Sequence, residues 1–346
     1  MDCGLPTVHS KQWLVSPVES AIRNPQSAPG SILVVKPSSL GDIVHTLPAV
    51  AAIKRHWPAA HLRWIVNPEW APLLEDNPHV DEIVNFPRAD FRGLRGAMRI
   101  APWALALRER AAADLVLDFQ GLLRSALIAK LCRREGGRIV GLSDAREGAR
   151  HFHDERADVS GCTHAVDRYL ALVRALGIGV PAKLEWTLPE GTRPCGFAAG
   201  EPFIVLHPFS RGKGKSLSVA DVTEFCRALV SWRIVLAGRT GECVPPLPNV
   251  TDLLNRTTLA ELIWLVRRAD CVVSVDSGPM HIAAALNARL FSIHTWSDPA
   301  KVGPYHPEAW IWKDGALFQM NAPDVRRPAA DLGAFASAVR GAVHAA

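Results

Sequence analysis

The stretch ILVVKPSSLGDIVHTLPAV, residues 32–50, sets the architecture expected of this chain. It begins with an apolar, β-branched run, passes through a turn of small residues, and continues with an apolar segment of helical length. A strand, a turn and a helix in this order form the repeating unit of a parallel α/β sheet. The turn then lies at the carboxyl edge of the sheet, where open α/β folds bind their ligands.

The same alternation recurs along the chain in two blocks. Short apolar runs such as ADLVLDF and FIVLHP alternate with helix-length segments such as GLLRSALIAKLC and LAELIWLVRRA. The Pro- and Gly-rich segment LPEGTRPCGFAAGEP separates the blocks and is typical of a linker. We therefore predict an N-terminal extension (1–30), two doubly wound α/β domains with mainly parallel sheets (31–185 and 200–328), and a C-terminal helix (329–346).

Composition narrows the class of protein. The chain has 346 residues, 48% of them hydrophobic and 21% charged, which suffices for two buried cores. A net charge of +5 indicates modest attraction to anionic partners and is far from the dense basic runs of nucleic-acid-binding arms. Seven cysteines without a C-x-x-C pair predict a reduced, cytoplasmic setting. No signal peptide or membrane-spanning run is expected, so surface association is the remaining membrane option.

The turn KPSSLGD offers the first candidate site. Ser38 and Ser39 provide hydroxyl and N–H groups, Gly41 permits a tight turn, and Asp42 begins the helix. Asp42 has two interpretations: it caps the helix, which contributes about 0.5–2 kcal/mol, or it is a general base kept ionised by the helix terminus. The turn lacks the G-x-G-x-x-G pattern, which disfavours a nicotinamide-dependent enzyme.

The motif VVSVDSGPMHIAAAL is the second candidate. A strand over 271–275 ends in Asp276, Ser277 and Gly278, and Pro279 suits the first turn of the following helix. The N–H groups at that terminus make an anion site, to which the Ser277 hydroxyl and the His281 ring add possible donors. The alternatives are a capping role for Asp276 and a satisfied, half-buried ring for His281.

The loop HPFSRGKGKSLS follows another strand. Its GKS lacks the first glycine of a phosphate-binding P-loop, so that interpretation fails. Arg211, Lys213 and Lys215 nevertheless suit charge-assisted contacts with a diphosphate, and a solvated basic loop is the alternative.

Two further sets of residues are candidates for acceptor contacts. The motif DFQGLLRSA places Gln120 at a strand end and Arg124 in the next helix, where surface solvation is the alternative. A basic set with i, i+3 and i+4 spacing predicts one helical face, either solvated or attracting an acidic lipid or sugar, and consists of Arg88, Arg92, Arg95 and Arg99.

Together, these motifs resemble those of the ADP-heptose:lipopolysaccharide heptosyltransferases of glycosyltransferase family 9. The resemblance runs in order from about residue 31 to residue 325. It implies the GT-B arrangement, in which two Rossmann-like domains face each other. The acceptor is then expected on the N-terminal domain and the nucleotide sugar on the C-terminal domain.

The resemblance also assigns roles to residues. It implies that Asp42 is the catalytic base, and that Lys215 neutralises the diphosphate leaving group, although Lys213 stays an alternative for that lysine. Acceptor contacts are expected from Ser39, Gly41, Gln120 and Arg124. Donor contacts are expected from Ser210, Arg211, Lys215, Glu242, Asp276, Ser277, Gly278, Pro279, Met280 and His281.

The resulting hypothesis is an inverting glycosyltransferase at the cytoplasmic face of the inner membrane, in peripheral contact with it. It would transfer heptose from ADP-heptose to a Kdo-lipid A or heptosylated-core acceptor, with no metal or cofactor and no nucleic-acid partner. The alternatives are a GT-B enzyme that uses another nucleotide sugar or acceptor, a sugar-nucleotide 2-epimerase, and a non-catalytic nucleotide-sugar-binding protein.

Overall fold

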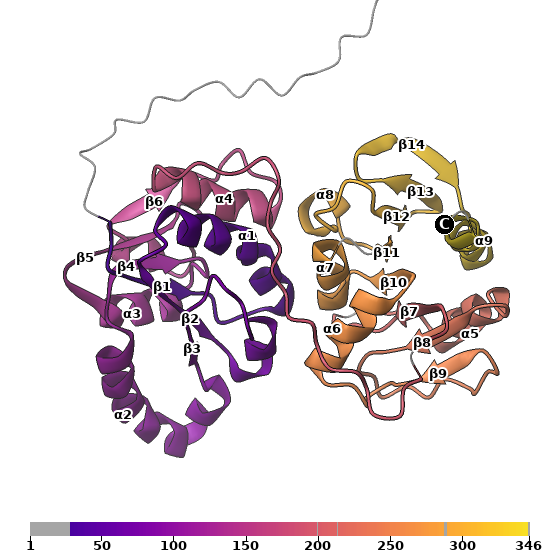
Figure 1. The fold of residues 1–346 in the computed structure, drawn as a ribbon, viewed down its shortest axis with the longest axis horizontal. Coiled ribbons are helices and arrows are strands. Elements are labelled where there is room, and N and C mark those ends of the chain that lie inside the picture. The colour runs from indigo at the N-terminus through magenta and orange to yellow at the C-terminus, as the bar shows by residue number, and fades with distance from the viewer. Residues whose placement is uncertain (1–27, 199, 213, 287–288, 345–346) are drawn as a thin grey trace, which may run out of the picture.

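The computed structural model describes residues 28–198, 200–212, 214–286 and 289–344. Within these ranges the chain forms two α/β halves that lie side by side (Figure 1). The expected N-terminal extension falls outside the described residues, except for its last three positions.

The first half is built on a six-stranded parallel sheet of order β3-β2-β1-β4-β5-β6. Its strands are β1 (Ser31–Val35), β2 (His61–Val66), β3 (Glu82–Asn85), β4 (Ala113–Asp118), β5 (Arg133–Leu142) and β6 (Glu155–Ala157). The central strand β1 is buried along its whole length, which accounts for its unbroken apolar sequence.

Helices and 3-10 turns connect these strands. They are α1 (Leu40–His56), α2 (Gly93–Ala111), α3 (Leu123–Cys132) and α4 (Ala165–Ala175), with 3-10 turns η1 (Pro68–Leu73), η2 (Arg88–Phe91) and η3 (Ala149–Phe152). The prediction that four arginines line a single helical face is wrong. Arg88 lies in η2 and Arg92 precedes Gly93, whose φ of +69° marks a change of direction, so only Arg95 and Arg99 share α2.

The second half is built on an eight-stranded sheet of order β14-β13-β12-β11-β10-β7-β8-β9. Its strands are β7 (Phe203–His207), β8 (Arg233–Leu236), β9 (Val250–Asp252), β10 (Cys271–Val275), β11 (Leu290–Ile293), β12 (Trp310–Lys313), β13 (Ala316–Gln319) and β14 (Ala322–Pro328). The pairs β12–β13 and β13–β14 are antiparallel and the other pairs are parallel.

The helices of this half are α5 (Val219–Ala228), α6 (Leu259–Arg268), α7 (Gly278–Ala285), α8 (Pro299–Val302) and α9 (Leu332–His344). The C-terminal helix α9 packs on the second core, where Phe335, Ala336 and Val339 are fully buried. Residues between α4 and β7 that the structure describes form no helix or strand, in keeping with a linker.

The two halves meet where α1 and α7 begin. A Cβ added to Gly41 would lie 2.5 Å from the His281 ring, and one added to Gly278 would lie 2.7 Å from the Leu40 side chain. The two glycines therefore allow the N-termini of α1 and α7 to approach closely. Since α1 follows β1 and α7 follows β10, this contact joins the carboxyl edges of both sheets.

Candidate functional site

Asp42 lies in the first turn of α1, directly after the carboxyl end of β1. Its Oδ2 accepts hydrogen bonds from the Ser39 N–H at 3.0 Å and from the Ser39 hydroxyl at 2.7 Å. Its side chain is 36% exposed, so a ligand can reach it. Asp42 thus caps the helix and also presents a carboxylate to solvent.

Two buried residues contact the other oxygen of this carboxylate. The Tyr169 hydroxyl, from α4, donates to Asp42 Oδ1 at 3.1 Å, and Lys36 Nζ lies 3.7 Å from the same atom. Burial opposes ionisation of Asp42, but the Lys36 charge and the Ser39 and Tyr169 hydrogen bonds prevail and lower its pKa. Burial lowers the pKa of Lys36 itself, which the charge of Asp42 partly offsets.

The acceptor candidates lie around this turn. The Gln120 side-chain oxygen accepts from the Ser38 N–H at 3.4 Å, which links the loop after β4 to the turn after β1. Gly41 is buried against His281, whereas Ser39 is exposed. Arg124 is exposed near the start of α3. The structure therefore brings Ser39, Gly41 and Gln120 to the Asp42 turn and leaves Arg124 on the adjoining surface.

Lys215 and Asp276 form the centre of the donor candidates. Lys215 Nζ lies 2.7 Å from Asp276 Oδ2 and 5.3 Å from the centre of the Trp296 ring. Burial favours the protonated form of Asp276, but hydrogen bonds from Lys215 and Ser297 lower its pKa below the ordinary value. The ion pair therefore sets a cation at the carboxyl end of β10, beside the start of α7.

The remaining residues of the donor turn are held firmly. Ser277 is the N-cap of α7, and its hydroxyl lies 3.3 Å from His207 Nδ1. Pro279 occupies the first turn, as expected, and Met280 is buried with its sulfur accepting from the Ser292 hydroxyl at 2.8 Å. These contacts hold the helix start in place, with its N-terminal N–H groups at the junction of the two halves.

His281 points to the first half of the molecule. Its Nδ1 lies 2.9 Å from His45 Nε2, and the His45 ring centre is 5.0 Å from that of His164. Burial, reinforced by the nearby His164, lowers the pKa of His281 to about 4. The role of His281 as a hydrogen-bond donor to a phosphate stays a prediction. Its Nδ1 is already occupied by the contact with His45.

The remaining donor candidates lie in the loops that follow β7 and β8. Glu242 is exposed in the loop after β8, where its N–H donates to the Thr240 hydroxyl at 3.0 Å. The Ser210 N–H donates to the Ser216 hydroxyl at 2.9 Å, and Arg211 is exposed. Lys213, the alternative donor-loop lysine, lies outside the described residues.

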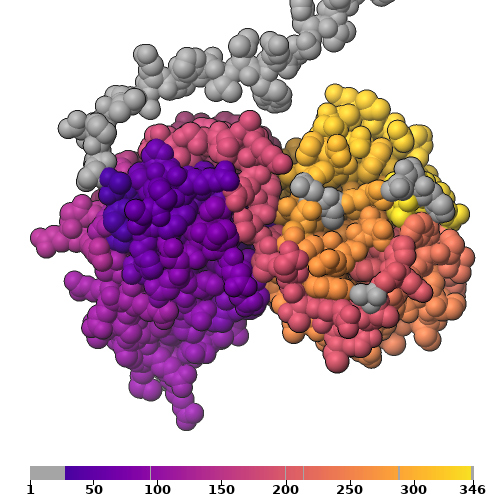
Figure 2. Space-filling view, in the orientation of Figure 1, coloured from indigo at the N-terminus to yellow at the C-terminus, as the bar shows by residue number. Residues whose placement is uncertain are grey.

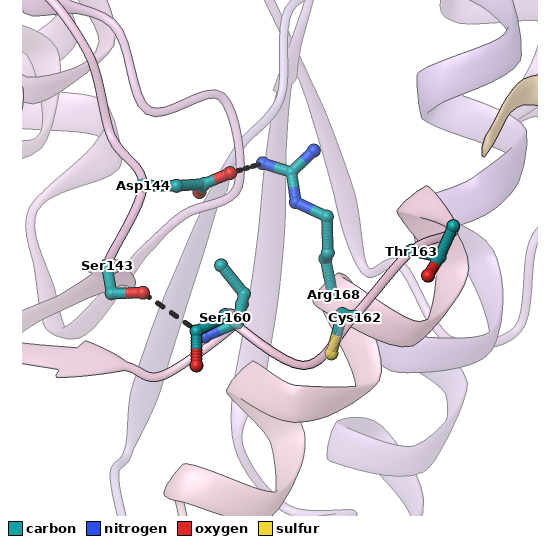
Figure 3. A pocket seen from close by; sticks show the side chains of 7 residues that line it. Ser143, Asp144, Ser160, Cys162, Thr163 and Arg168 are labelled. Atoms are coloured by element: carbon teal, nitrogen blue, oxygen red, sulfur yellow. Dashed lines mark hydrogen bonds and ion pairs between the residues drawn. The ribbon is translucent and has the colours of Figure 1, made fainter.

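A pocket of about 340 Å³ opens where β5 and β6 end and α4 begins (Figure 3). Arg168, the residue before Tyr169, pairs with Asp144 in this pocket. The lining is rich in hydroxyl groups and comprises Ser143, Asp144, Val159, Ser160, Cys162, Thr163 and Arg168. Such a lining suits polyhydroxylated ligands.

Sequence reasoning missed three residues at these sites. Lys36 is the first residue of the turn KPSSLGD, directly after the buried strand β1, so a lysine at that strand end was a usable signal. Trp296 lies in the segment TWSDP, just after the buried strand β11, and an exposed tryptophan there was a usable signal. Tyr169 gave no signal, because it is 127 residues from Asp42 in the sequence.

Two facing α/β halves, each with a candidate turn at the carboxyl edge of a mainly parallel sheet, define a GT-B glycosyltransferase fold. The chain belongs to glycosyltransferase family 9, the heptosyltransferases, whose family model matches residues 103–321. It is therefore a glycosyltransferase.

Relatives and solved structures agree with this assignment. The lipopolysaccharide heptosyltransferase 1 of Salmonella typhimurium is 28% identical over 300 residues, which cover 79% of this chain and 91% of that protein. The structure of the E. coli heptosyltransferase WaaC with ADP matches with a TM-score of 0.71 and 22% identity, covering 91% of this chain and 99% of the other. E. coli heptosyltransferase II matches with a TM-score of 0.72, 21% identity and the same coverage.

The part of the chain that the structure describes holds no helix with the length and apolar character needed to cross a membrane. Nor do its His, Cys, Asp and Glu side chains gather in groups of three or more that would hold a metal ion.

Proposed function

We propose that this enzyme transfers heptose from ADP-heptose to an inner-core lipopolysaccharide acceptor, with Asp42 as the general base. The observation that carries the proposal is the contact between the start of α1 and the start of α7. It brings the helix that bears Asp42 to the helix that begins the donor turn. The family and the names of the relatives support heptose as the sugar.

The geometry of Asp42 leaves room for a substrate hydroxyl. A carboxylate accepts about four hydrogen bonds, and Tyr169 and Ser39 supply three. The acceptor hydroxyl takes the fourth position and gives its proton to Asp42 while its oxygen attacks the anomeric carbon. The bond from that carbon to the ADP phosphate oxygen breaks, and the configuration inverts.

Charge on the departing ADP is neutralised from the second half. The ammonium of Lys215 has three N–H donors, so it bonds Asp276 and a phosphate oxygen together. The N-terminus of α7 adds oriented N–H groups where negative charge develops. We infer that these groups act without a bound metal.

The acceptor sugar is proposed to lie along the carboxyl edge of the first sheet, from Asp42 toward the pocket of Figure 3. Tyr169 and Arg168 are consecutive in α4, so one helix connects the base to that pocket. Hydroxyl groups of Ser143 and Ser160 suit the hydroxyls of an inner-core sugar.

The chain provides a matched control for testing Asp42. Asp221 begins α5 and accepts from the Ser218 N–H at 3.1 Å and hydroxyl at 2.7 Å, the same contacts that Asp42 makes with Ser39. Asp42→Asn should lower kcat by at least about 10²-fold while ADP binding persists. Asp221→Asn should lose only the capping contribution.

The assay is ADP release from ADP-heptose with and without a deacylated Kdo-lipid or a heptosylated core. Release that depends on one of these acceptors supports the proposal and shows which step the enzyme performs. The proposal is contradicted if the enzyme releases nucleotide only from a nucleotide sugar other than ADP-heptose. Full transfer activity in Asp42→Asn contradicts the role of Asp42 as the base.

A further inference from the structure

Helix α2 is attached to the first half by one of its faces. Leu107 and Ala111 are buried, and the Trp103 ring centre lies 5.3 Å from that of Phe86 and 5.1 Å from that of Phe91. This aromatic cluster holds the helix against the sheet. In Figures 1 and 2 the α2 region forms a projection at the lower edge of the first half, away from the second.

The opposite face of α2 exposes large apolar side chains. Met98 is 72% exposed and Leu105 is 64% exposed, and their separation of seven residues places them on one side of the helix. Val230, Trp296 and Val325 are similarly exposed but stand singly on separate segments, and the pair Leu123 and Leu127 on α3 is less exposed, at 39% and 51%. A paired apolar face on a projecting helix therefore stands apart from ordinary surface residues.

Cationic side chains surround this apolar face. Arg95 lies one turn before Met98, and Arg99 follows it at the next position. Within the described residues neither arginine forms an ion pair, and the same holds for Arg88 and Arg92 at the approach to the helix. Residues 88–108 contain five arginines, and the acidic side chains of this segment and the rest of α2 are Asp90 and Glu109, the latter one turn after Leu105, so the surface carries a net positive charge.

We propose that this outer face of α2 is a docking surface for an anionic lipid bilayer. Met98 and Leu105 enter the boundary between headgroups and acyl chains, and the arginines contact lipid phosphates. A nucleic acid would use the arginines but would leave the apolar pair in water, so the bilayer fits better.

The topology gives this docking a direction. Helix α2 follows β3, which runs parallel to β1, so η2 and the start of α2 lie toward the carboxyl edge that carries Asp42. A bilayer held by α2 would therefore lie near the edge where a lipid-linked acceptor is expected. The surface itself does not depend on the role of Asp42, and it is tested without substrate.

The test is flotation of the full chain with vesicles of phosphatidylcholine mixed with phosphatidylglycerol, against phosphatidylcholine alone. Arg95→Gln with Arg99→Gln should weaken binding about thirtyfold at low salt and reduce its salt dependence. Met98→Ser with Leu105→Ser should weaken it at least about tenfold and preserve the salt dependence.

Matched controls lie elsewhere on the surface. Val230→Ser with Val325→Ser removes equally exposed apolar groups, and Arg193→Gln with Arg256→Gln removes exposed charges. Both should bind as the unchanged chain does. The proposal is overturned if the unchanged chain does not float with anionic vesicles, if the α2 variants float as well as the controls, or if only a DNA duplex is bound.

Discussion

His45 Nε2 lies 2.9 Å from His281 Nδ1, so one hydrogen bond joins α1 of the first half to α7 of the second. The other ring nitrogen of His45 is buried and has no partner in the described structure. Protonating His45 would place a donor there without an acceptor, and burial together with His281 and His164 lowers its pKa well below the ordinary value. The junction that brings the Asp42 turn to the Asp276 turn therefore requires neutral histidines.

Acid should weaken this junction. The pKa of His281 is lowered to about 4, below the ordinary value near 6.5, so the unfolded chain binds more protons between these values. The contribution of His281 is thus complete above about pH 7 and is lost as the pH falls toward 4. We expect a loss of up to about 3 kcal/mol in the free energy of unfolding, measured by denaturant titration at several pH values.

A double replacement tests the origin of that pH dependence. His45→Leu with His281→Leu removes two titrating rings and should reduce the slope of the stability profile between pH 6.5 and 4, while the buried His207 and His294, whose pKa values are also about 4, keep part of it. His151→Gln, at an exposed histidine, should leave the profile unchanged. An unchanged slope in the double variant would show that other groups govern acid sensitivity.

Gly41 should not tolerate a methyl group. In Gly41→Ala the new Cβ would lie 2.5 Å from the His281 ring, so α1 and α7 must move apart. We expect a destabilisation of about 1–3 kcal/mol and a reduced transfer rate. Gly341→Ala is the control, since a Cβ at that helical position meets nothing within 4 Å and should stabilise slightly. Thermal unfolding of both variants and their transfer rates measure the difference.

Lys36 should control the acidic limb of the pH–rate profile. Its charge lowers the pKa of Asp42, so Lys36→Met should raise that pKa and move the acidic limb of kcat/KM to higher pH. Lys54→Met removes a lysine from the far end of α1 that pairs with Asp81 at 2.6 Å, and should leave the limb in place. A fall in rate with an unmoved limb would mean that Lys36 acts only in packing.

We expect Lys215, and not a metal ion, to neutralise the charge on the departing ADP. Lys215→Met leaves the carboxylate of Asp276 uncompensated beside the diphosphate, and we expect kcat to fall about 10²–10³-fold with weaker ADP binding. Transfer by the unchanged enzyme should persist after dialysis against EDTA. Loss of activity in EDTA, restored by a divalent cation, would refute the metal-free leaving-group mechanism.

Much of the fold follows from local patterns. Buried parallel strands have no polar face, so β1, β7 and β10 appear as nearly continuous apolar runs. The antiparallel extension from β12 to β14 was not predicted, because exposed and short strands lack that signature. The spacing of the arginines wrongly predicted one helix over residues 88–99. The chain changes direction at Gly93, where η2 has ended and α2 begins, and periodicity alone does not show this.

Sequence by itself determined that Asp42 and Asp276 each stand at the carboxyl end of a buried strand and at the start of a helix, since strand, turn and helix formation are local. Only the tertiary structure decided what surrounds them. Lys36 and Tyr169 around Asp42, and His45 against His281, are contacts set by packing between segments distant in the chain. Packing depends on the shapes of both surfaces, which no single stretch of sequence encodes.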